Sequence, residues 1–299
     1  MNHLQVKNIE INGVSYGYIE QGAGPLILCI HGFPDNAYSF AGQLDALSRL
    51  GYRVVAPFLR GYSPTGASPD GKYHVAQVAS DMIALIKGLG YEKAILIGHD
   101  YGAAIAHSAA LLAPETVVAL VTESVPHGPE MAMGIVTNPE QQRRSWYIYF
   151  FQLPFAEMAV SFNDYAFIDR LWNDWSPGWS LPREHVEGVK RTLAEPGVLS
   201  AALGYYRTAL GAPPEDAVLA ELAQRAGAGP IAVPCLYVHG QNDGCVGADL
   251  TQDMHKYFTK NFSRLVIEGA GHFVHLEKPD VFNRAVIDFL KEHTAGSGR

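Results

Sequence analysis

The chain has 299 residues and a formal net charge of −8 at pH 7, and 48% of its residues are hydrophobic while only 17% are charged. A nucleic-acid-binding protein would carry a basic face, because phosphate neutralisation supplies most of its affinity, so the acidic balance excludes nucleic acid and a polybasic membrane contact as expected partners. No apolar run approaches the roughly 18 residues needed to cross a bilayer, and the composition therefore predicts a globular protein with one sizeable core.

Up to residue 125, short apolar segments alternate with longer amphipathic ones. Strands are predicted at 14–20, 26–30, 53–57, 94–97 and 117–122, and helices at 40–50 and 75–89. The turn at Asn12 and Gly13 predicts that the first strand belongs to an antiparallel hairpin. Such alternation of strand and helix is typical of a mostly parallel sheet with helices on both faces.

The alternation stops in the middle of the chain, which is rich in aromatic residues. Helices are predicted there at 141–151, 164–173, 184–194 and 217–226. Beyond a Gly- and Pro-containing hinge the alternation resumes, with strands at 235–238 and 265–267 and helices at 248–258 and 279–291. The predicted organisation is an α/β core in two parts, residues 1–128 and 230–299, with a helical cap at 129–229 between them.

Residues 98–102, Gly-His-Asp-Tyr-Gly, follow an apolar strand and precede an Ala-rich helix. This is the small-x-nucleophile-x-small pattern of a strained strand-to-helix turn, in which a Cβ at either flank would collide with neighbouring backbone. The central residue is Asp100, and a carboxylate needs no base to attack saturated carbon and form an ester. Taken alone, Asp100 could also be a simple helix cap.

Two further strand exits supply an acid and a histidine. Asp243 follows the strand predicted at 235–238, and His272 ends the Gly-Ala-Gly-His segment after the strand at 265–267. Open α/β proteins place their site residues at these strand ends, and nucleophile, acid and histidine follow one another in the expected chain order. Each residue alone would be an ordinary loop residue, but together they predict a nucleophile, an orienting acid and a base.

The loop after the strand predicted at 26–30 supplies a further part of the candidate site. Residues 31–34, His-Gly-Phe-Pro, can direct the backbone N–H of Phe33 toward the nucleophile. With the N–H of Tyr101 it would form an oxyanion hole. We interpret His31 as a structural residue.

Two other patterns do not support a cofactor. Residues 66–73 match a phosphate-binding loop except that Tyr73 stands in place of the Ser or Thr that would hold Mg²⁺, and no strand precedes them. His272 and His275 could suggest a metal, but no acidic third ligand has a matching spacing. The sequence therefore predicts no cofactor and no metal.

These motifs together resemble the α/β-hydrolases over nearly the whole chain, and more narrowly the epoxide hydrolases of that superfamily. The resemblance implies an α/β-hydrolase fold, with a mostly parallel eight-stranded sheet, helices on both faces and a helical cap inserted after the sixth strand. It also implies that the partners are a small-molecule epoxide and water and that the product is a vicinal diol. In this scheme Asp100 forms an alkyl-enzyme ester, and His272, oriented by Asp243, activates the water that hydrolyses it.

In this family two cap tyrosines hold the epoxide oxygen. The motif aromatic-Gln-x-Pro at the end of 147–154 selects Tyr147, and Gly-Tyr-Tyr-Arg at 204–207 selects Tyr206. Tyr149 and Tyr205 are the alternatives that a small alignment slip would choose. All four tryptophans fall within residues 146–179, which suggests an apolar pocket and a hydrophobic epoxide. The candidate lining residues are Trp146, Phe150 and Trp175.

Dehalogenases of the haloalkane and fluoroacetate type share the same frame and the Asp nucleophile, so they are the alternative activity. Phe33 and Tyr101 stand where haloalkane dehalogenases usually carry Asn and Trp as halide donors. Fluoroacetate dehalogenases resemble a His-Trp pair where this chain has Tyr147 and Ile148. Many epoxide hydrolases also have Trp at the position of Tyr101, which affects the pocket shape rather than the chemistry. A ligand-binding protein without catalysis is the alternative from another class.

The sequence also bears on location. Residues 1–5 show neither the basic nor the apolar part of a signal peptide, and Cys29, Cys235 and Cys245 are too few and scattered for a disulfide framework or zinc site. A cytoplasmic location is therefore expected. A homo-oligomer is compatible with the sequence, which leaves the oligomeric state and the natural substrate open.

Overall fold

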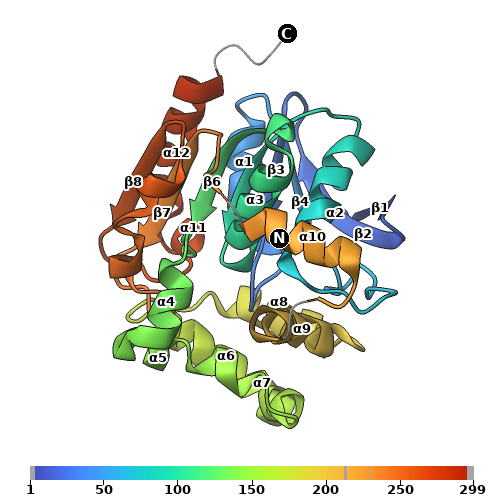
Figure 1. Cartoon of the computed structure of the whole chain (residues 1–299), viewed down its shortest axis with the longest axis vertical. Coiled ribbons are helices and arrows are strands. Elements are labelled where there is room, and N and C mark those ends of the chain that lie inside the picture. Colours follow the sequence, from blue (N-terminus) through green and yellow to red (C-terminus); the bar gives the residue numbers. More distant parts are fainter. Residues whose placement is uncertain (1–3, 212–213, 228, 295–299) are drawn as a thin grey trace.

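The computed structural model describes residues 4–211, 214–227 and 229–294 and contains one eight-stranded sheet (Figure 1). Its strands are β1 (Lys7–Ile11), β2 (Val14–Gln21), β3 (Leu26–Ile30), β4 (Arg53–Pro57), β5 (Ala94–His99), β6 (Val117–Glu123), β7 (Cys235–Gly240) and β8 (Phe262–Ile267). Their order is β1-β2-β4-β3-β5-β6-β7-β8. β2 pairs antiparallel with β1 and β4, and every other neighbouring pair is parallel. The predicted mostly parallel sheet is confirmed.

Helices cover both faces of this sheet and one of its ends. They are α1 (Ala41–Ser48), α2 (Val75–Gly88), α3 (Tyr101–Leu112), α4 (Glu130–Thr137), α5 (Pro139–Arg144), α6 (Trp146–Phe150), α7 (Ala156–Trp175), α8 (Arg183–Ala194), α9 (Val198–Leu210), α10 (Ala217–Gly227), α11 (Val274–Glu277) and α12 (Pro279–Thr294). On one face α10 packs against α2 and α3, and on the other α1 packs against α12 (Figure 1). Helices α4 to α9, which we term the helical layer, lie together beyond one end of the sheet.

The central strands β3, β5 and β7 are buried along their whole length, whereas the edge strand β8 is only partly buried. Parallel strands that are covered on both faces have continuous apolar sequences. For this reason their positions could be predicted from the sequence. The carboxyl ends of parallel strands meet at one edge of the sheet. The loops that follow β3, β5, β7 and β8 therefore converge beneath the helical layer.

The first hairpin follows from its turn residues. Asn12 and Gly13 have φ values of 51° and 76°, and Ile11 pairs with Val14 across the turn. Two consecutive positive φ values match the twist of paired strands, and Asn-Gly adopts them at low cost. The predicted antiparallel hairpin is confirmed.

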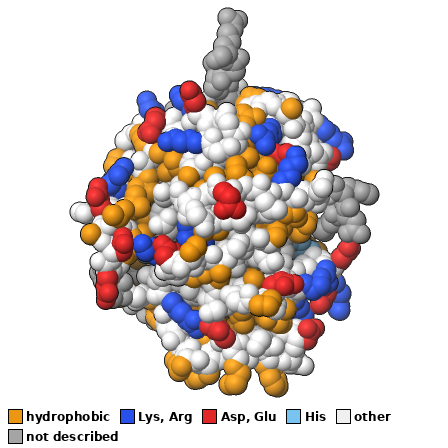
Figure 2. Space-filling view, turned by 90° about the vertical axis from the view of Figure 1, so that its right-hand side faces the viewer, with side chains coloured by type: hydrophobic (Ala, Val, Ile, Leu, Met, Phe, Trp, Pro, Cys, Tyr) orange, Lys and Arg blue, Asp and Glu red, His pale blue; other side chains and the backbone are white. Residues whose placement is uncertain are grey.

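The helical layer is more broken than predicted. The helix expected at 141–151 is two helices, α5 and α6, because the chain leaves the helical conformation at Ser145 (φ −87°, ψ 9°). Helix α7 bends within 162–165, where three consecutive non-glycine residues have positive φ. Apolar side chains gather at the lower end of the space-filling view (Figure 2), and Met158 and Phe162 on α7 are exposed. The predicted cap boundaries at 129 and 229 stay a prediction. Helix α10 lies within the predicted cap, but it packs against α2 and α3 of the core.

The prediction of one helix at 248–258 is wrong. The structure has two short 3-10 turns there, Ala248–Thr251 and Met254–Tyr257. Arg264 on β8 donates from Nη2 to the Ala248 carbonyl (3.0 Å) and from Nε to Thr251 Oγ1 (2.8 Å). A carbonyl of the first helical turn is thereby held by a distant side chain, which favours the tighter turn.

No described helix combines the length and the apolar character of a membrane span. The three cysteines are buried and free.

Candidate active site

Asp100 occupies a strained turn between β5 and α3. Its φ and ψ are 52° and −121°, a conformation that costs a non-glycine residue roughly 1–3 kcal/mol. A Cβ on Gly98 would lie 2.3 Å from the Gly102 carbonyl oxygen, and one on Gly102 would lie 1.9 Å from the Ile30 carbonyl oxygen. The two glycines therefore permit the turn, which holds the Asp100 side chain at the sheet edge.

The loop after β3 surrounds the same carboxylate. The backbone N–H of Phe33 donates to Asp100 Oδ1 over 2.9 Å. A Cβ on Gly32 would lie 2.4 Å from Asp100 Oδ1 and 2.7 Å from the backbone nitrogen of Tyr101. Both predicted oxyanion donors are thus brought close to the Asp100 carboxylate.

His31 shapes this loop rather than facing the carboxylate. Its Nδ1 donates to the Gly32 carbonyl (2.9 Å), and its Nε2 accepts from the backbone N–H of Leu59 (3.0 Å). Burial lowers the pKa of His31 to about 4, so the ring stays neutral and can accept this bond.

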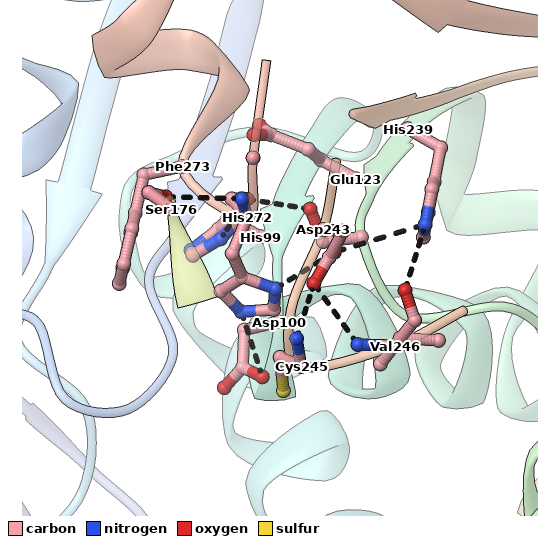
Figure 3. Close-up of polar contacts among 12 residues, drawn as sticks. His99, Asp100, Glu123, Ser176, His239, Asp243, Cys245, Val246, His272 and Phe273 are labelled. Atoms are coloured by element: carbon pink, nitrogen blue, oxygen red, sulfur yellow. Dashed lines mark hydrogen bonds and ion pairs between the residues drawn. The ribbon is translucent and has the colours of Figure 1, made fainter. Parts of the chain in front are cut away.

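His272 lies between the two carboxylates (Figure 3). Its Nδ1 is 2.9 Å from Asp243 Oδ2, and its Nε2 is 3.4 Å from Asp100 Oδ2. Asp243 Oδ1 accepts the backbone N–H groups of Cys245 (2.7 Å) and Val246 (2.9 Å). Both carboxylate oxygens of Asp243 therefore have hydrogen-bond partners, and the acid holds the His272 imidazole in one orientation.

The charges at the site are strongly coupled. Burial lowers the pKa of His272, but Asp243 and Asp100 outweigh this effect and raise it to about 10. Burial also raises the pKa of Asp243, yet His272 and the backbone amides bring it below its usual range. The arrangement without substrate is an imidazolium between two carboxylates.

The backbone of His272 is held from two sides. Its N–H lies 3.1 Å from both the Trp175 carbonyl oxygen and Ser176 Oγ, at the end of α7. Its carbonyl accepts from Ser124 Oγ (2.6 Å) and from His99 Nε2 (3.1 Å), at the ends of β6 and β5. His272 is consequently fixed by the helical layer as well as by the core.

Two phenols face this group from the helical layer. The rings of Tyr147 on α6 and Tyr206 on α9 are buried, with centroids 5.5 Å apart. Burial above all, and then nearby Cys245 for Tyr147 and Asp100 for Tyr206, raises both pKa values well above the ordinary value. Tyr147 Oη lies 3.3 Å from Cys245 Sγ, whereas Tyr206 Oη has no hydrogen-bond partner among the described residues. Both hydroxyls remain neutral donors at pH 7.

The two alternative tyrosines use their hydroxyls elsewhere. Tyr205 donates to the Arg60 carbonyl (2.8 Å). Tyr149 is 44% exposed and donates to the Ile135 carbonyl (3.0 Å).

The aromatic residues proposed as pocket lining fall into two groups. The Trp175 ring centroid lies 4.9 Å from the rings of both Tyr147 and His272. Trp146 and Phe150 instead pack on each other, with centroids 5.8 Å apart, and within the described part of the chain neither ring contacts His272. Trp175 therefore borders Tyr147 and His272, and the other two form an outer aromatic layer.

Sequence reasoning missed two residues of the site. Phe151 is fully buried, and its ring contacts those of Phe33, Tyr147 and Tyr206. Cys245 brings its thiol against Tyr147. Its position two residues after Asp243, in a strand-exit loop, was the signal that could have identified it.

The helical layer is tied directly to the loop that carries Phe33. Three hydrogen bonds connect residues 34–36 with it: Trp172 Nε1 to the Pro34 carbonyl (3.0 Å), His185 Nε2 with Asp35 Oδ1 (2.7 Å), and Asn36 Nδ2 to Thr192 Oγ1 (3.1 Å). Asp100, Tyr147 and Tyr206 are each no more than 3% exposed. A substrate must therefore pass between the layer and the core.

Comparisons with known proteins place this geometry in context. The model of the alpha/beta hydrolase fold family matches residues 25–279. Human epoxide hydrolase 4 is 32% identical over 98% of this chain and 80% of its own length, and epoxide hydrolase 3 of Xenopus tropicalis is 32% identical over 94% and 76%. The crystal structure of Bacillus megaterium epoxide hydrolase in complex with an inhibitor superposes with a TM-score of 0.81 at 26% identity, covering 95% of this chain and all of that one.

Proposed function

The chain belongs to the alpha/beta hydrolase fold family and, within it, to the epoxide hydrolases, and from this premise we propose that it opens an epoxide to a vicinal diol. One observation carries the proposal: a carboxylate at the nucleophile position is faced by two buried neutral phenols, Tyr147 and Tyr206. Two phenol donors suit an ether oxygen that gains negative charge as a C–O bond breaks.

In the first half-reaction, the epoxide lies between the core and a cap formed by residues 129–229. Its oxygen accepts hydrogen bonds from Tyr147 and Tyr206. Asp100 Oδ2 attacks a ring carbon from the side opposite the breaking C–O bond, and an ester and an alkoxide result. The Phe33 N–H keeps Oδ1 in place, which leaves the other oxygen to attack.

The proton balance follows from the charges. His272 begins as an imidazolium because Asp100 and Asp243 raise its pKa to about 10. Ester formation removes the charge of Asp100 and so lowers the pKa of His272. The proton that His272 releases neutralises the alkoxide, and the neutral imidazole left behind is a competent base.

In the second half-reaction, His272 Nε2 takes a proton from water while Asp243 stabilises the imidazolium that forms. The hydroxide attacks the ester carbonyl carbon of Asp100. The N–H groups of Phe33 and Tyr101 hold the oxyanion, and its collapse releases the diol and regenerates both charges. The position of His272 Nε2, 3.4 Å from Asp100 Oδ2, supports its action on a water that attacks the Asp100 ester.

The surroundings support an apolar substituent on the epoxide. Trp175, Phe151 and Phe33 border the phenols and the carboxylate, and all three are at least 99% buried. An apolar pocket with a few convergent polar groups favours a hydrophobic substrate.

The test is a screen of the purified protein with terminal, internal and aromatic epoxides, with diol formation measured by mass spectrometry. We expect diol from at least one class and none from Asp100→Ala. Halide release from a haloalkane or fluoroacetate, with no diol from any epoxide, would instead make the chain a dehalogenase. Binding without turnover that survives Asp100→Ala would make it a ligand-binding protein.

A further inference from the structure

Three buried side chains meet directly behind the site without being part of the reaction. Asp35, His99 and His275 are each no more than 1% exposed, and one ligand atom from each lies within 4.8 Å of the other two. Asp35 Oδ2, His99 Nδ1 and His275 Nε2 have no hydrogen-bond partner among the described residues. Three unsatisfied polar atoms in one buried place require an explanation.

The hydrogen bonds on the far side of each ring identify these atoms as acceptors. His99 Nε2 must donate to the His272 carbonyl (3.1 Å), which leaves a lone pair on Nδ1. His275 Nδ1 donates to the Glu123 carboxylate (3.0 Å), so Nε2 is the ring nitrogen left for another partner. Asp35 Oδ2 is a carboxylate oxygen and only accepts. Each of the three residues therefore has one atom without a described partner, and the cluster brings one ligand atom of each within 4.8 Å of the others.

Two buried acidic side chains belong to or contact this cluster. Asp35 and Glu123 are both buried carboxylates, and in the described part of the chain the basic side chains that contact them are histidines, His185 and His275. Buried carboxylates are stable only when they are paired or bind a cation. A divalent cation between the three acceptors would satisfy the lone pairs and offset both carboxylates.

The donor set has the composition of a transition-metal site. Two imidazoles and one carboxylate suit zinc and its neighbours in the first transition row, and three protein ligands leave one coordination position open. Each ligand is also held by a second hydrogen bond: His275 by Glu123, His99 by the His272 carbonyl, and Asp35 Oδ1 by His185. Such outer contacts fix the tautomer and orientation of metal ligands.

We propose that Asp35, His99 and His275 form a buried site for a divalent transition-metal cation of the zinc class. Asp35 follows the loop of Phe33, His99 immediately precedes Asp100, and His275 lies on α11 just after His272. A bound ion would join the three loops that carry the oxyanion donor, the nucleophile and the base. Sequence spacing rejected a metal at His275 because no acid lay nearby, but the fold brings Asp35 from a distant part of the chain.

A second group must be distinguished in any test. Asp100, Cys245 and His272 also place three ligand atoms within 4.8 Å of one another. Only that group contains sulfur, and Zn–S bonds of about 2.3 Å differ from Zn–N and Zn–O bonds of about 2.0–2.2 Å. The presence or absence of a sulfur ligand therefore shows which of the two groups binds the zinc ion.

The experiment uses tag-free full-length protein, stripped with a chelator, equilibrated with one equivalent of Zn²⁺ and desalted. Elemental analysis should find about one zinc per chain in the wild type and in Cys245→Ser, and at least about tenfold less in His275→Gln. X-ray absorption at the zinc edge should show only nitrogen and oxygen ligands. Circular dichroism checks that His275→Gln is folded, and Asp35→Asn, which keeps the side-chain shape, provides the same measurement if it is not.

Three results would overturn the proposal. A wild type that retains no zinc would mean that water or a proton fills the space between the acceptors. A sulfur ligand, with zinc lost in Cys245→Ser, would place the ion at the reacting groups. Zinc retained equally by folded Asp35→Asn and His275→Gln would exclude these ligands. None of these readouts depends on epoxide hydrolysis.

Discussion

The core half and the helical half of the site are held in different ways. Asp100, Asp243 and His272 follow strands of the sheet; backbone N–H groups donate to the carboxylate of each acid, and the Trp175 carbonyl accepts from the backbone N–H of His272. Tyr147 lies on the short helix α6 and Tyr206 on α9, and both are positioned by aromatic contacts. Their hydroxyls have a thiol as a partner or no described partner.

The difference assigns separate tasks to the two halves. The core half has its charges balanced and its orientation set without a substrate. The helical half presents two phenol hydroxyls, which a substrate oxygen can engage, on a layer that is joined to the core by side-chain and backbone hydrogen bonds. We therefore expect chemistry to depend on the core half, oxygen stabilisation on the phenols, and access on the contacts between layer and core.

The largest effect should come from removing the nucleophile. Asp100→Ala should reduce kcat/KM for diol formation by about 10⁴-fold or more, because the remaining groups have nothing to alkylate. Steady-state kinetics of diol formation measure this loss of kcat/KM. Asp45→Ala, which removes an exposed carboxylate paired with Arg49, is the matched control and should leave the rate unchanged. A rate for Asp100→Ala within tenfold of the wild type would place the nucleophile elsewhere.

The phenols come next. Tyr206→Phe and Tyr147→Phe should each lower kcat by about 10²–10³-fold, the cost of one donor to a developing oxyanion. Tyr205→Phe is the neighbouring control, because its hydroxyl is engaged with the Arg60 carbonyl. It should cost about 1 kcal/mol of stability and leave kcat within a few-fold. If Tyr205→Phe were the slower enzyme, the two roles would be exchanged.

A smaller effect is expected where the helical layer meets the oxyanion loop. Trp172→Phe retains a ring to stack on Phe273 but leaves the buried Pro34 carbonyl unpaired. The free energy of unfolding should fall by about 1–3 kcal/mol. Because Pro34 follows Phe33, kcat/KM should fall as well, by roughly tenfold or less. Denaturant titration and kinetics test both, and a loss as large as that of the phenols would show that access and chemistry are not separate.

The smallest effect should come from Tyr149, which shares α6 with Tyr147. Its hydroxyl lies at the surface, so Tyr149→Phe should change stability by no more than about 0.5 kcal/mol and leave kcat unchanged. The same substitution on one short helix then separates a reacting phenol from an exposed one. Equal losses at both positions would instead indicate damage to α6 itself.

The core half could be predicted because parallel strands leave a clear pattern in sequence. Asp100, Asp243 and His272 each follow an apolar run closely, and topology brings the ends of such runs to one edge. The alternation predicted a mostly parallel sheet interrupted once by helices, whereas the eight strands and the insertion after the sixth came from the family resemblance.

The remainder depends on contacts between distant segments. Helical periodicity does not reveal which face of α6 or α9 turns toward Asp100. Tyr147 and Tyr206 were therefore identified only through the family resemblance, and Phe151 was missed. At 248–258 the expected helix is replaced by two 3-10 turns, which are held by hydrogen bonds from the distant Arg264 that leave no local signal in the sequence. Asp35 could not be paired with His99 and His275 until the sheet had placed their loops together.

The central claim, a covalent ester on Asp100 that His272 hydrolyses, is tested most directly by intact-protein mass spectrometry of His272→Gln. The variant is incubated with an epoxide that the wild type converts to diol. We predict a mass increase equal to that of one epoxide, located by peptide mapping on the segment that contains Asp100. An unmodified variant that still produces diol, or a label on a different residue, would contradict the account.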